Sequence, residues 1–200
     1  MKNKQPLIAL LSAAVLLAAS PVSFACACCS DRGQYDVSVG ALAKYQVELL
    51  KDMHFGATPE LYLPDADAII GMEDLGLGDL SLIDAYTHNT WRLTIKSTTG
   101  KMGTLILPRP ARVTLKKIDL HDREEGEPAL YKEWSFEGTV ASGSGVFGRG
   151  IIRPTKYTLL FQGRGNNCDN AEDFTHWRLE VKGRKASYAF FGPMKAGPAT

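Results

Sequence analysis

The 200-residue sequence lacks an excess of charge of either sign. Its 23 lysine and arginine residues nearly balance its 22 aspartate and glutamate residues, so the formal net charge is +1 at neutral pH. A chain this close to neutrality has no general electrostatic attraction to nucleic acid or to an anionic membrane surface. We therefore expect no nucleic-acid partner.

The sequence also lacks the motifs of common catalytic sites. It contains neither an H-E-x-x-H zinc motif nor a G-x-S-x-G nucleophile motif, and its four histidines are scattered along the chain. The segment Gly143–Gly148 matches G-x-G-x-x-G, but a dinucleotide site needs a helix directly after the glycines. Because Arg149–Pro154 contains further helix breakers and β-branched residues, we predict a glycine-rich hairpin or bulge here. Since no catalytic motif is found in the sequence, we predict a non-catalytic protein.

No apolar run is long enough to span a membrane. The longest, Leu7–Ala19, would extend about 20 Å as a helix, which is less than the ~30 Å hydrocarbon core of a bilayer. It follows a basic start and precedes Pro21, and the small residues Ser23 and Ala25 then precede a cleavage site. This pattern is typical of a secretory signal peptide, so we expect residues 1–25 to be removed and the protein to be exported, periplasmic or secreted.

Besides cleavage after Ala25, two other ways of processing the N-terminus are compatible with the sequence. Ala25 and Ala27 also satisfy the small-x-small rule, so cleavage after Ala27 would remove Cys26. Lipidation of Cys26 would instead anchor the protein, but the preceding residues 22–25 lack the leucine that a lipoprotein signal carries near position −3. These outcomes leave different numbers of cysteines in the mature chain.

Three of the four cysteines lie within four residues, and only the fourth is distant. In an exported chain, the expected chemistry is a structural disulfide between Cys168 and the N-terminal cluster, through Cys28 or Cys29. The alternative is a soft-metal site, because closely spaced thiolates suit copper or zinc. The disulfide candidates and the thiolate-ligand candidates are the same four residues: Cys26, Cys28, Cys29 and Cys168.

Short segments of alternating apolar and polar residues, separated by turn residues, dominate the chain from residue 90 onward. Such a pattern predicts a mainly β fold, a single antiparallel β-barrel or sandwich of about eight strands. The expected strands are residues 91–96, 104–107, 113–120, 130–138, 146–152, 157–162, 177–182 and 188–191.

The domain boundaries follow from these patterns. We expect a cysteine-rich segment over 26–34 and one β-rich domain over 35–200. Residues 41–53 carry apolar side chains at both helical and alternating spacing, and the alternation favours a strand over 44–53. Glycines and acidic residues over 64–84 predict an irregular connection.

A polar loop between the last strands is the candidate ligand contact. If the loop lies at the mouth of a barrel or sandwich, its side chains can bind a ligand or a cation. A further hypothesis is a hydrolase in which His176 and Asp173 form an acid–base pair. The competing interpretation is that Asn and Asp side chains satisfy the backbone of turns. The candidates are Arg164, Asn166, Asn167, Asp169, Asp173 and His176.

The function that the sequence favours is therefore binding rather than catalysis. We expect an exported β domain that binds a small or apolar ligand, or a partner protein of the cell envelope, without a cofactor. The alternative is a thiolate protein that binds copper or zinc. We also expect no transmembrane segment in the mature chain.

Overall fold

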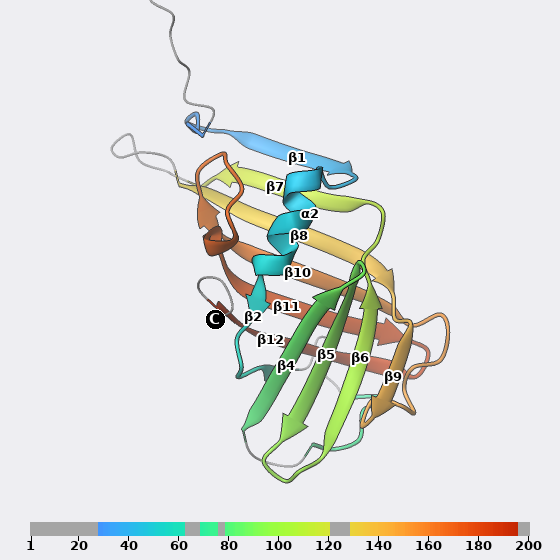
Figure 1. Ribbon diagram of the computed structural model, residues 1–200. Helices are drawn as coiled ribbons and strands as arrows, with labels where there is room; N and C mark the ends of the chain where they lie inside the picture. Colours follow the sequence, from blue (N-terminus) through green and yellow to red (C-terminus); the bar gives the residue numbers. More distant parts are fainter. Residues whose placement is uncertain (1–27, 63–68, 76–78, 121–128, 196–200) are drawn as a thin grey trace, which may run out of the picture.

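The computed structural model describes residues 28–62, 69–75, 79–120 and 129–195. These residues form two antiparallel sheets of eight and four strands, one α-helix and one short 3-10 helix (Figure 1). The predicted signal peptide, Cys26 and part of the 64–84 connection lie outside the described residues. The elements are β1 (Tyr35–Gly40), α2 (Lys44–Asp52), β2 (His54–Phe55), β3 (Glu60–Tyr62), β4 (Leu80–Thr87), β5 (Thr90–Ser97), β6 (Met102–Pro108), β7 (Val113–Asp119), β8 (Leu130–Thr139), β9 (Ser142–Gly145), β10 (Lys156–Gly165), η1 (Ala171–Asp173), β11 (Phe174–Gly183) and β12 (Ala186–Lys195).

The larger sheet has the order β1-β7-β8-β10-β11-β12-β2, and β3 also pairs with β12. The smaller sheet has the order β4-β5-β6-β9, and its strands run across those of the larger sheet (Figure 1). The prediction of mainly antiparallel β structure is confirmed. The barrel alternative is wrong, because both sheets of the described chain stay open at their edges, and they contain twelve strands rather than about eight.

The core lies between the two sheets and is rich in aromatic rings. Trp91 of β5 in the smaller sheet packs edge-to-face on Phe136 of the larger sheet, with ring centroids 4.9 Å apart. Phe55 of β2 packs in the same way on Phe161 and Trp177, at 5.5 and 5.0 Å. Each of these rings is at most 1% exposed, so the alternating apolar residues of both sheets are buried in one shared core.

Residues 44–52 form a helix, so the prediction of a strand over 44–53 is wrong. The side chain of Gln46 accepts a hydrogen bond from the backbone N–H of Ala43 at 2.9 Å, and this contact closes the first turn. Gln46 and Leu50, four residues apart, are buried on one face of the helix. The alternation of Tyr45, Val47 and Leu49 is therefore incidental, because the packed face follows a helical period.

Residues 146–150 form turns, so the predicted strand over 146–152 is wrong as well. Val146 and Phe147 are apolar because they fill one end of the core, where they are 3% and 0% exposed. The strand of this region is β9, which ends at Gly145 and pairs with β6. Gly145 has a φ of +58°, and a Cβ there would lie 2.1 Å from the carbonyl oxygen of Met102, so only glycine fits.

Candidate functional site

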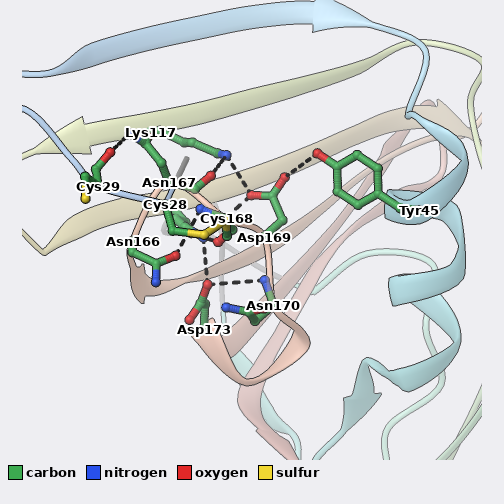
Figure 2. Close-up of a disulfide and its surroundings, with 11 residues drawn as sticks. Cys28, Cys29, Tyr45, Lys117, Asn166, Asn167, Cys168, Asp169, Asn170 and Asp173 are labelled. Atoms are coloured by element: carbon green, nitrogen blue, oxygen red, sulfur yellow. Dashed lines mark hydrogen bonds and ion pairs between the residues drawn. A yellow bond between two sulfur atoms is a disulfide. The ribbon is translucent and has the colours of Figure 1, made fainter. Parts of the chain in front are cut away.

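A disulfide joins the start of the described chain to the connection between β10 and β11 (Figure 2). Cys28 and Cys168 are 140 residues apart in sequence, and their Cα atoms lie 4.8 Å apart. The predicted link between Cys168 and the N-terminal cluster is therefore confirmed, with Cys28 as the partner. Cys29 is exposed and lies outside this bond.

Hydrogen bonds dock the N-terminal segment beside the disulfide. The backbone N–H of Asn167 donates to the carbonyl oxygen of Cys28 at 3.1 Å, and its side-chain amide donates to the carbonyl oxygen of Cys29. The same amide also bonds the side chain of Gln34, which directly precedes β1. These contacts fix the entry of the chain into the edge strand of the larger sheet.

Four charged side chains meet behind the disulfide and form a buried charge cluster: Lys117, Lys132, Asp169 and Asp173. Lys132 of β8 is 0% exposed, and its Nζ lies 2.6 Å from Oδ2 of Asp173 and 3.6 Å from Oδ1 of Asp169. It also donates to the carbonyl oxygen of Cys168. Lys117 of β7 lies 2.9 Å from Asp169, so two cations face two anions and no net charge is buried.

Asp169 connects the charge cluster to helix α2. Tyr45 approaches its Oδ2 at 3.5 Å (Figure 2). Gln46 donates to the same oxygen at 2.9 Å. Burial raises the pKa of Asp169, but the hydrogen bonds from Gln46 and Lys117 and the charges of both lysines outweigh it and hold the pKa below its usual value. Burial and the nearby carboxylate raise the pKa of Tyr45.

The predicted ligand loop thus separates into two groups. Asn167, Asp169 and Asp173 come together with Cys168 and are engaged within the protein, and Asn166 accepts a hydrogen bond from the backbone N–H of Cys168 at 2.9 Å. Arg164 and His176 are exposed and lie elsewhere, and His176 bonds the hydroxyl of Thr175 at 2.9 Å. Because Asp173 faces Lys132 in the interior, the structure does not bring it to His176 as an acid–base pair.

His176 instead lines a hollow on the outer face of the larger sheet, the face that points away from the smaller sheet. Its strand neighbour Trp177 is buried in the core, so His176 and Arg178 project to the opposite face. The hollow has a volume of about 390 Å³. We call it the outer hollow, and the residues that line it are Tyr62, Gln162, His176, Trp177, Arg178 and Phe191.

Tyr62 and Phe191 form the aromatic wall of the outer hollow, and the rest of its lining includes polar side chains. The rings of Tyr62 and Phe191 meet edge-to-face with centroids 5.4 Å apart. The guanidinium of Arg178 lies 5.2 Å from the ring centre of Tyr62 and also bonds Glu180. Burial raises the pKa of Tyr62, and the positive charge of Arg178 opposes this shift.

A row of hydrogen bonds continues from the outer hollow across the sheet. Gln162 donates to the hydroxyl of Tyr131 at 3.1 Å, Tyr131 donates to Glu133 at 2.6 Å, and Lys116 donates to Glu133 at 2.6 Å. Burial, the hydrogen bond to Glu133 and its charge raise the pKa of Tyr131 to about 12. Burial raises the pKa of Glu133, but its hydrogen bonds with Lys116 and Tyr131 outweigh burial and hold the pKa below its usual value. The row holds Gln162 in place at the edge of the hollow.

Six of these residues were not predicted from the sequence: Tyr62, Lys117, Lys132, Gln162, Arg178 and Phe191. Lys132 had a detectable signal, because it alternates with Trp134 and Phe136 and so had to share their inward face. Arg178 had the opposite signal, because it lies between Trp177 and Leu179 and so had to face outward. The sites of Lys117, Tyr62 and Phe191 are set by strand pairing, which the sequence does not record.

The structure also bears on a thiolate metal site and on membrane-spanning helices. The described residues contain no group of three or more His, Cys, Asp or Glu side chains arranged to hold a metal ion. Cys28 and Cys168 are also bonded to each other, so neither is a thiolate ligand while the disulfide is intact. Within the described residues, no helix is long and apolar enough to cross a membrane.

Comparisons with protein-family models, with curated proteins and with solved structures gave no match to this chain. Any function must therefore be argued from the site itself.

Proposed function

We propose that this protein is an exported, non-catalytic β domain that binds a small ligand in the outer hollow. The observation that carries the proposal is the hollow of about 390 Å³, which is lined by two aromatic rings in contact and by an arginine, a histidine and a glutamine. Ligand pockets have volumes of roughly 300–1,000 Å³ and combine apolar walls with a few polar groups. The hollow has both properties.

The rest of the molecule supports binding by a rigid surface. The lining residues lie on β3, β10, β11 and β12, which are paired with one another, and not on the polar loop. The charge cluster and the disulfide hold that loop and the N-terminal segment together. An intact disulfide is compatible with the oxidising compartment that an exported protein enters.

Export is tested by the mass of the protein isolated from the cell envelope or the medium. Cleavage after Ala25, cleavage after Ala27 and lipidation of Cys26 give three different masses, and we expect the first. A product that retains Met1 would contradict export through a cleaved signal peptide.

Ligand binding is tested by screening small apolar fragments by ligand-observed NMR. Phe191→Ala removes one aromatic wall and should weaken binding of the fragments on the order of 10-fold. Ile83→Ala is the matched control, because Ile83 is an apolar side chain that is 71% exposed on β4 of the other sheet. The proposal fails if no fragment binds, or if both variants bind fragments as the unsubstituted protein does.

A further inference from the structure

The outer hollow presents positive charge without an opposing carboxylate in its lining. Among the described residues that line it, Arg178 is a cation, His176 becomes one on protonation, and none is acidic. Glu180 bonds one end of Arg178 but is outside this lining, and Lys182 approaches the same carboxylate at 4.0 Å. Arg178 and Lys182 thus share the one carboxylate of Glu180, which leaves one positive charge over beside the hollow, and the exposed Glu60 of β3 is the cross-strand partner of Phe191.

The polar groups of the hollow also keep hydrogen-bonding capacity. Nη2 of Arg178 bonds Glu180, whereas its Nε is buried and has no hydrogen-bond partner among the described residues. Nδ1 of His176 is engaged by Thr175, which leaves Nε2 on the other side of the ring. Gln162 directs its amide nitrogen toward Tyr131 and Glu133 and keeps its carbonyl oxygen.

The aromatic wall determines what the rest of the ligand is. Phe191 is 36% exposed although it is a large apolar side chain, and its ring meets Tyr62 edge-to-face. Stacking of the guanidinium on Tyr62 holds the cation at the boundary between this wall and the polar groups. A flat apolar body on Phe191 would thus place an attached anionic group toward Arg178.

The geometry points to a small aromatic carboxylate as the ligand of the outer hollow. The aromatic ring packs against Phe191 and Tyr62, and the carboxylate accepts hydrogen bonds from Arg178, with Gln162 and His176 beside it. This inference rests on the proposed function and specifies its ligand class.

The test uses two probes of the same shape, 2-naphthoate and its uncharged analogue 2-naphthamide, titrated calorimetrically at pH 8. A hydrogen bond to a charged acceptor is roughly twice as strong as one to a neutral acceptor, so naphthoate should bind on the order of 10-fold more tightly than naphthamide. The advantage of naphthoate should shrink as salt is added, because screening weakens charge interactions at an exposed site.

Two variants locate the effect. Arg178→Gln should remove the preference for naphthoate and change the affinity for naphthamide little. Arg164→Gln is the matched control, because Arg164 is an exposed arginine of neighbouring β10 that does not line the hollow, and it should keep the preference. The probe pair measured on the unsubstituted protein keeps the test valid even if Arg178→Gln disturbs the fold.

The possible outcomes separate the two claims. If both probes bind equally and both lose affinity in Phe191→Ala, the carboxylate inference is wrong and the proposed function stands. If naphthoate does not bind, or if Arg178→Gln keeps the preference, the inference is also wrong. The fragment screen then decides separately whether the hollow binds any ligand.

Discussion

Lys132 lies in an inward row of β8, between Leu130 and Trp134, and is completely buried. A buried ammonium is stable only when carboxylates and hydrogen bonds replace its water. Asp173, Asp169 and the carbonyl oxygen of Cys168 provide this replacement. Lys116, one strand away on the outer face, pairs with Glu133 but stays 36% exposed.

We expect substitution of Lys132 to lower the free energy of unfolding much more than substitution of Lys116. Lys132→Met should lower the free energy of unfolding by about 3–5 kcal/mol, because it leaves buried carboxylates without their cation. Lys116→Met should lower it by about 1 kcal/mol, because water reaches Lys116 and Glu133 keeps its hydrogen bond from Tyr131. Urea unfolding at pH 7 measures both, and equal losses would contradict the role given to the charge cluster.

We expect Asp169 to contribute to the stability of the fold in a way that depends on pH. Its pKa is lower in the folded protein than the value of ~3.9 expected when unfolded, so the unfolded state binds the proton more readily. The ionised group therefore stabilises the fold above about pH 4, and this stabilisation is lost as the pH falls through the folded pKa.

Asp169→Asn should consequently be less stable than the unsubstituted protein at pH 7, and the difference should narrow below about pH 4. Urea unfolding at a series of pH values checks this. A difference that is constant with pH would show that the ionised carboxylate is not the source.

At the scale of elements, the disulfide and α2 meet the connection between β10 and β11 from two sides. Cys28 holds it covalently, and Gln46 holds it through Asp169. Thus the edge strand β1, the helix α2 and the last strands are all held through the connection between β10 and β11. The disulfide matters for residues 28–34 because they have few apolar side chains that could pack against the rest of the protein.

Removal of the disulfide should lower stability substantially. Cys168→Ser should lower the free energy of unfolding by about 4–5 kcal/mol, the value of the chain-entropy model for a loop closed over a sequence separation of 140 residues. It should also expose residues 28–34 to protease.

A double-mutant cycle provides the control. Cys28→Ser should match Cys168→Ser, and the double variant should cost no more than either single one, because both remove the same bond. Additive losses would mean that the two sulfur atoms act independently.

At the scale of the whole molecule, the two sheets are predicted to unfold together, because aromatic rings of both fill one core. Leu105 of β6 and Leu159 of β10 are both fully buried, one in each sheet. Each change to alanine should lower stability by about 2–5 kcal/mol.

Native-state hydrogen exchange distinguishes one cooperative unit from two. Leu105→Ala should lower the opening free energy of the most protected amides in β10 as much as in β6, because both exchange through global unfolding. If the amides of β10 were unaffected, the sheets would be independent units.

Local sequence patterns were sufficient to predict the β class, most of the strands after residue 90 and the cluster that contains the partner of Cys168. Alternation records which side chains of a strand face the core, so Trp91, Trp134 and Trp177 marked buried faces before any contact was known. The compartment inferred from the apolar N-terminus favoured oxidation of Cys168, whose only distant partners lay in residues 26–29.

The remaining features depend on contacts between residues that are distant in sequence. Gln46 lies on the buried face of α2 and bonds Asp169, and Val146 and Phe147 are apolar because they are buried in the core, although they lie in turns rather than in a strand. The charge cluster and the outer hollow are likewise made by strand pairings, since a local pattern carries no record of which distant strand becomes a neighbour.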